Sequence, residues 1–173
     1  MTTRSIEYFQ SLVKELSKYP DETEWIEFKC NVNDPQMIGE YISALSNSAA
    51  LSGKPKGYVV WGINNESHDI EGTVFKYKRL KKGNEELESW LACMLTPYID
   101  FKFIEIPMDD VTVVVLEIPS ADSQPVGFAG VEYIRVGTTK RRLKKFPEKE
   151  RELWRVFDSL PYELRNAASS LSE

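Results

Sequence analysis

The chain has 173 residues, 42% of them apolar and 28% charged, and this is the make-up of one globular domain. Its four Trp, eight Tyr and eight Phe exclude a wholly disordered chain, and no run approaches the ~20 apolar residues of a membrane span. A net charge of −5 does not predict a general attraction to polyanions, and the lack of a signal peptide leads us to expect a cytoplasmic protein.

The first third of the chain predicts a helix, a strand and a second helix. Apolar residues at helical spacing predict the first helix over 5–18. Residues 24–30 predict a strand that carries Glu27 and Lys29 on one face. An Asp-Pro pair opens residues 34–51 and is typical of a helix N-terminus. The last turns of this helix consist of small residues, so we expect another backbone or a ligand to approach it closely.

The middle of the chain predicts two strands and a third helix. A β-rich run over 58–63 predicts a central strand, and residues 70–74 are expected to pair beside it. Asn84, Glu85 and Glu86 are expected to open the helix, which a proline ends.

The last third predicts two hairpins and a fourth helix. Short turns join predicted strands 101–106 and 111–118, and then 125–128 and 131–136. The helix over 147–160 is expected to turn four apolar side chains inward. These are Leu153, Trp154, Phe157 and Leu160.

This order of elements predicts an α+β fold. We expect a mixed, largely antiparallel sheet of about five to seven strands with about four helices. One domain is expected over 1–158, followed by a tail or truncated linker over 159–173. The oligomeric state stays open, with a homodimer as one alternative.

Glu22, Glu27 and Lys29 form the first constellation that could carry chemistry. On a strand, positions 27 and 29 share a face, so a carboxylate could hold a divalent metal while the ammonium steadies a phosphate charge. Nucleases use this local geometry. The alternative is an exposed strand face with an ion pair of little energetic value.

The loop after the predicted central strand carries Asn64, Asn65, Glu66, His68 and Asp69. Functional loops are often built at such strand ends, although an ordinary turn is the alternative. His68 is the only histidine, and we expect it at the surface.

Two further sequence features predict little chemistry. Cys30 and Cys93 lack zinc-ligand spacing and are expected to be reduced, partly buried thiols. Residues 53–57 do not match a Walker loop, although their glycines and the small helix end could admit a backbone phosphate.

Two basic clusters hold ten of the 22 basic residues. The first consists of Lys76, Lys78, Arg79, Lys81 and Lys82, and the second of Lys140, Arg141, Arg142, Lys144 and Lys145. Like charges this close repel unless a polyanion neutralises them, so nucleic acid is the expected partner if the fold brings the clusters together. Solvated loops without a partner are the alternative. Tyr77, Tyr133, Arg135 and Phe146 could add stacking surface for unpaired bases.

Five segments together resemble the Schlafen-type AlbA_2 domain over residues 20–157. They are the Glu22 to Lys29 segment, the helix end 42–47, the strand 57–63, the Ile-Glu-Gly at 70–72 and the stretch 133–137. The resemblance implies a DNA- or RNA-binding domain of bacterial transcriptional regulators, a family once labelled divergent AAA or ATP-binding.

In animal Schlafen proteins the family implies a Mg- or Mn-dependent ribonuclease with three acids. Glu22 and Glu27 match two of them, whereas Asn64 and Asn65 stand where the third acid belongs. Glu66 or Asp69 would have to replace it, and amides bind divalent cations more weakly than carboxylates.

Three functions follow. The first is a nucleic-acid-binding domain that contacts phosphates through the basic clusters, with Arg135 and Lys29 beside them. The second is the metal-dependent ribonuclease, with Glu22, Glu27 and Asp69 or Glu66 at the metal and Lys29 as charge stabiliser. The third is a nucleotide (ATP)-binding or protein-interaction domain. We rank them in this order.

Overall fold

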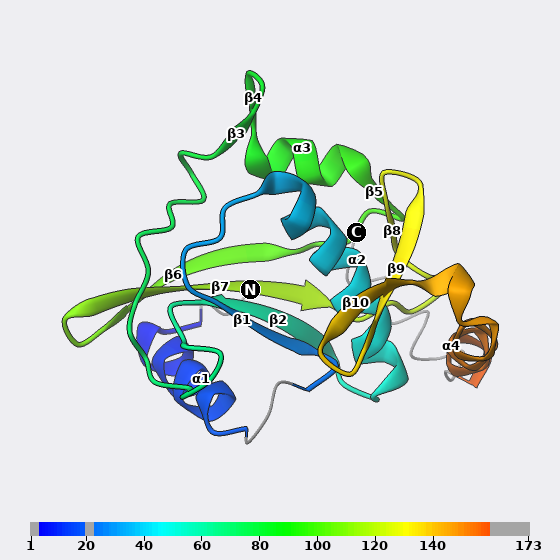
Figure 1. The fold of residues 1–173 in the computed structure, drawn as a ribbon, viewed down its shortest axis with the longest axis horizontal. Coiled ribbons are helices and arrows are strands. Elements are labelled where there is room, and N and C mark those ends of the chain that lie inside the picture. Colours follow the sequence, from blue (N-terminus) through cyan, green and yellow to red (C-terminus); the bar gives the residue numbers. More distant parts are fainter. Residues whose placement is uncertain (1–3, 20–22, 160–173) are drawn as a thin grey trace.

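A four-stranded sheet organises the computed structural model, which describes residues 4–19 and 23–159. Its strands lie in the order β1 (Ile26–Lys29), β2 (Lys56–Trp61), β7 (Val111–Pro119) and β6 (Lys102–Met108). β1 pairs in parallel with β2, and the other pairs are antiparallel (Figure 1).

A helix covers each face of this sheet. On one face, Phe9 and Val13 of α1 (Ile6–Ser17) pack in one apolar cluster with Val60 and Val115. On the other face, α2 (Pro35–Leu51) packs against the alternate strand residues, including Val59 and Leu116. Because both faces are covered, the middle of β7 is buried without interruption, which explains its continuous apolar run.

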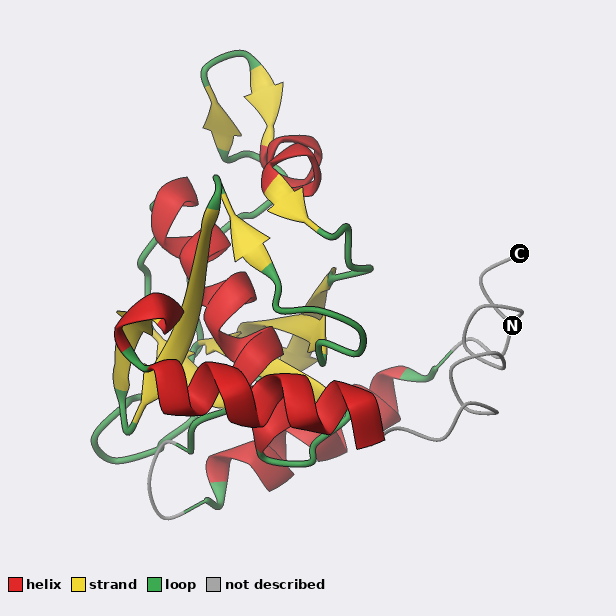
Figure 2. Cartoon of the chain, turned by 90° about the vertical axis from the view of Figure 1, so that its right-hand side faces the viewer, coloured by secondary structure: helices red, strands yellow, loops and turns green. Residues whose placement is uncertain are grey.

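A second sheet lies across the far side of α2 (Figure 2). It has the order β10 (Thr139–Arg142), β9 (Val131–Val136), β8 (Gly127–Phe128) and β5 (Leu95–Thr96). A short 3-10 helix, η1 (Leu143–Lys145), leads into α4 (Pro147–Ser159), which packs against α2. α3 (Leu87–Met94) follows the small hairpin of β3 (Lys81–Lys82) and β4 (Glu85–Glu86).

Polar side chains of α2 hold the second sheet in place. The buried Asn47 donates to the carbonyls of Val126 at 3.0 Å and Tyr133 at 2.8 Å, and accepts from the Val126 N–H at 2.8 Å. Ser43 accepts from the Tyr133 N–H, and Ser48 from the Arg135 N–H, each at 3.0 Å. The expected close approach to the small residues of α2 is confirmed, and the segment that packs against them is the backbone of β9.

The α+β class, the four helices and both hairpins are confirmed. The described strands are divided among three sheets: α2 lies between the two larger ones, and β3 and β4 form the third. No helix of the described residues is long and apolar enough to cross a membrane. Leu160 and the tail after it lie outside the described residues.

Several local predictions are wrong. Residues 70–74 form no strand, only a single bridge between Ile63 and Ile70. Glu85 and Glu86 belong to a hairpin, because they pair with the two lysines of β3. Trp154, expected to face inward, is 44% exposed. The described part of α4 buries Leu153 and Phe157 instead. Both cysteines are exposed free thiols.

An ion cluster ties the amino terminus to the first sheet. The Arg4 guanidinium donates two hydrogen bonds of 2.7 Å to the buried carboxylate of Glu117, and Lys56 Nζ lies 3.5 Å from the same group. Burial raises the pKa of Glu117, but the hydrogen bonds and charges of Arg4 and Lys56 outweigh it and lower the pKa overall.

Acid should therefore remove the stabilisation that Glu117 provides. Its folded pKa is below the unfolded value of about 4.3, so the contribution is complete above that pH and is lost as the pH falls through the folded pKa. We expect the difference in unfolding free energy between the native protein and Arg4→Ala, measured in urea, to shrink from pH 7 to pH 3. A difference independent of pH would contradict this assignment, and Lys14→Ala on the exposed side of α1 is the control.

Candidate nucleic-acid interface

Glu27 is buried beneath two cations. Its side chain projects from β1, with Oε1 at 2.9 Å from Lys29 Nζ and Oε2 at 3.1 Å from Arg135 Nη1. The Tyr41 hydroxyl donates to Oε1 at 3.5 Å. Glu27 is only 5% exposed, so the expected open strand face is wrong, because β9 covers it with Arg135.

Arg135 joins the second sheet to the edge strand of the first. It is completely buried, and its Nη1 also donates to the carbonyl of Ile26 in β1. Since β1 is an outer strand, that carbonyl needs a donor from outside the sheet. Arg135 therefore acts as part of the framework, and the prediction that it offers stacking surface for bases is wrong, because it is completely buried.

The Tyr41 ring of α2 contacts two lysine ammonium groups. Lys29 Nζ lies 5.0 Å and Lys140 Nζ 4.7 Å from the centre of the Tyr41 ring, which is cation–π distance. Lys140 Nζ also lies 2.6 Å from Glu40 Oε1. The ring thus fixes a lysine of β1 and a lysine of β10 within about 10 Å of each other.

The pKa shifts agree with a charged Lys29 and a charged Glu40. Burial lowers the pKa of Lys29, but its hydrogen bond to Glu27 and the charge of that carboxylate outweigh burial and raise the pKa overall. Burial raises the pKa of Glu40, but the hydrogen bonds from Lys140 and Gln36, together with the charges of Lys140 and Arg142, outweigh burial and lower the pKa overall. Lys29, Arg135, Lys140 and Arg142 against Glu27 and Glu40 leave this surface with net positive charge.

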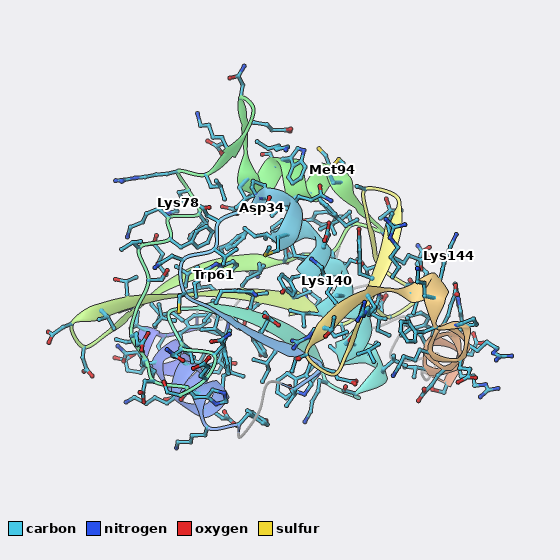
Figure 3. The ribbon with its side chains drawn as sticks, viewed as in Figure 1. Asp34, Trp61, Lys78, Met94, Lys140 and Lys144 are labelled. Carbon is cyan, nitrogen blue, oxygen red and sulfur yellow. The ribbon has the colours of Figure 1, made fainter. Side chains whose placement is uncertain are left out.

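The second basic cluster is divided. Lys140 and Arg142 alternate with Arg141 along β10, so they share the face that meets Glu40 and Tyr41. Lys144 and Lys145 lie in η1 and are exposed. Figure 3 shows Lys144 beside α4, well away from Lys140. The expected loop is in fact a strand followed by a 3-10 helix.

The first basic cluster is divided as well. Lys76 and Arg79 line an open pocket with Asn31 and Asn33, close to Lys29 in the chain. Lys78 lies over the Tyr77 ring, and the two lysines of β3 pair with glutamates across the hairpin. Tyr77 is buried and stacked on Phe103 at 4.8 Å, so the prediction that it offers a surface to bases is wrong.

Five cations follow one path across the surface. Lys140 and Lys29 both contact the ring of Tyr41. Lys29 also lines a shallow apolar hollow together with Tyr41 and Val32. Asn31 and Asn33, on either side of Val32, line the pocket that contains Lys76 and Arg79. We call this path the cationic strip and define it by five residues. They are Lys29, Lys76, Arg79, Lys140 and Arg142.

The acids expected at a metal do not assemble among the described residues. Glu22 lies outside them, and Glu27 is neutralised by Lys29 and Arg135. Glu66 and Asp69 are exposed in a turn that Asn64 Oδ1 closes by accepting from two N–H groups. The described part of the chain holds no group of three His, Cys, Asp or Glu side chains that could bind a metal. The residues described here therefore do not fit Mg or Mn.

Sequence reasoning missed Glu40 and Tyr41, which lie at the centre of the interface. Their positions on α2 indicate only one side of a helix. Nothing local in the sequence shows that β10 reaches them, because its contacts join residues about 100 positions apart. Likewise, Asn31 and Asn33 line a pocket only because the fold places residues 74–80 beside them.

The domain has an α+β fold and presents two lysines on Tyr41 beside a buried ion pair. A family model described as Schlafen, AlbA_2 matches residues 22–144, and the chain belongs to this family. It is accordingly a nucleic-acid-related domain. Among curated proteins, none matches the chain.

Two solved structures are similar to this chain. One is a protein from Corynebacterium diphtheriae, 15% identical with a TM-score of 0.44, over 79% of this chain and 26% of the other. This chain therefore spans about a quarter of that protein's length. The other is the N-terminal domain of a RecG-related protein from Nitrosomonas europaea, 24% identical with a TM-score of 0.48, over 80% of this chain and 93% of that domain.

Proposed function

We propose that this domain binds the phosphate backbone of nucleic acid along the cationic strip. The observation that carries the proposal is the pair of ammonium groups fixed on Tyr41. A lysine held by a ring and a carboxylate has already lost much of its side-chain freedom, so binding a phosphate orders it at little further cost.

The contacts favour recognition of the backbone over recognition of bases. Both lysines already occupy positions near the Tyr41 ring, and Tyr77 is buried. Phosphate contacts fix position but carry no sequence information. Binding to DNA or RNA with little sequence preference follows from this. The resemblance adds a transcriptional regulator as the setting in which the domain works.

A salt titration tests the proposal. If three to five strip cations each neutralise one phosphate, the logarithm of affinity for a short duplex falls with a slope of roughly −3 to −4.5 against the logarithm of salt concentration. Fluorescence anisotropy between 50 and 200 mM salt should then show a loss of roughly 50- to 500-fold. An affinity that stays flat over this range would refute the proposal.

A cleavage gel run beside this titration distinguishes simple binding from the ribonuclease alternative. The lack of an assembled acid group among the described residues leads us to expect binding to structured RNA that a chelator leaves unchanged. Cleavage that requires Mn²⁺ and disappears in Glu27→Gln would favour the ribonuclease instead.

A further inference from the structure

A pocket at one end of the cationic strip gathers positive charge and amide donors from two distant segments. Asn31 and Asn33 follow β1, and Lys76 and Arg79 come from the segment before β3. The pocket has a volume of about 240 Å³, and Val74, Phe75 and Leu80 complete its wall. This is smaller than the ~300–1,000 Å³ typical of sites for drug-sized ligands, so it suits one small group.

The geometry prepares the polar side chains for an anion. Asn31 Oδ1 accepts from the Thr73 hydroxyl and from the Val74 N–H, both at 3.0 Å. These bonds fix the orientation of the amide and leave its Nδ2 group as a donor. A turn in which the Arg79 N–H donates to the Lys76 carbonyl at 3.1 Å brings the two cations to the same pocket.

Lys76 and Arg79 differ from their neighbours in the first cluster. Lys81 lies opposite Glu86 and Lys82 opposite Glu85, and Lys82 also lies over the Trp90 ring. Those lysines lie in the hairpin and do not line the pocket. The cluster is thus a folded hairpin plus two cations directed to one hollow.

We propose that this pocket binds a terminal phosphate monoester. A terminal phosphate carries a charge of about −1.5 to −2 at neutral pH, which matches two cations. An internal phosphodiester carries only one negative charge. Arginine and amide donors also suit its several exposed oxygens. Because the pocket lies at one end of the cationic strip, the phosphate comes from the end of a bound strand. This last step depends on the proposed function, since a free nucleotide offers the same chemical group.

The test compares 5′-phosphorylated, 3′-phosphorylated and unphosphorylated forms of one oligonucleotide, alongside adenosine monophosphate. Fluorescence anisotropy follows the oligonucleotides, and calorimetry follows the nucleotide. We expect the native protein to bind one phosphorylated form about tenfold more tightly than the unphosphorylated one. Lys76→Gln with Arg79→Gln should abolish that preference. Lys81→Gln with Lys82→Gln removes the same charge from the hairpin and should retain it.

Each result decides a separate point. Loss of the preference in the pocket variant alone supports the proposal. Nucleotide binding that needs Lys76 and Arg79, without any preference among the oligonucleotides, would keep the phosphate pocket but overturn the strand end. Equal effects of both double variants, or no effect of either, would overturn the pocket itself. If the native protein binds no oligonucleotide, the proposed function fails, and the nucleotide titration alone decides the pocket. All four substituted side chains are exposed, so both variants should fold, which thermal melting verifies.

Discussion

Replacing Arg135 with leucine should cost about 3 to 5 kcal/mol in the free energy of unfolding. The change leaves the Glu27 carboxylate buried with one cation fewer, and it removes the donor to the Ile26 carbonyl. Breaking one partner of a buried ion pair is costly because the other charge stays out of water. Urea unfolding of Arg135→Leu measures the loss.

Two further variants make this result specific. Arg141→Leu changes an exposed residue of β10 and should alter stability by less than about 0.5 kcal/mol. Glu27→Leu combined with Arg135→Leu removes both charges, so it should recover part of the loss. If Arg135→Leu were no less stable than Arg141→Leu, Arg135 would not join the two sheets as described.

This network changes the meaning of the motif around Glu27. From the sequence, Glu27 and Lys29 resemble an acid and a lysine ready for a metal and a phosphate. In the fold, Lys29 and Arg135 neutralise Glu27, while Tyr41 holds Lys29 at the surface. Glu27 therefore acts as a positioning residue for cations.

The architecture could largely be predicted from local patterns. Apolar spacing and an Asp-Pro cap define α2, and two short turns define the hairpins β6–β7 and β8–β9. The errors arose where tertiary pairing overrides a local signal. Glu85 and Glu86 are typical of a helix start, but the lysines opposite them draw both into β4.

The interface could be predicted only in part. The strand pattern places Glu27 and Lys29 on one face, where the structure pairs them, yet the charge runs do not show which members of a run have partners. Tyr77 illustrates the limit, because an aromatic residue within a basic run is buried by stacking on Phe103 of β6. Which cations remain available depends on contacts between segments far apart in the chain.

The most direct test of the cationic strip is to neutralise its two cations on β10. Lys140→Gln with Arg142→Gln removes two phosphate contacts, so affinity for a short duplex should fall about tenfold or more at 100 mM salt. The salt slope should become shallower by about two. Glu40→Gln should have the opposite effect and tighten binding, because it removes a negative charge 2.6 Å from Lys140 that repels phosphate.

The matched control is Lys14→Gln with Lys18→Gln, which removes equal charge beside α1 on the opposite face of the first sheet. Measured by fluorescence anisotropy in one salt series, the strip variant should lose affinity and slope while the α1 variant keeps both. Equal losses in the two variants would show that binding follows net charge alone and would contradict the cationic strip.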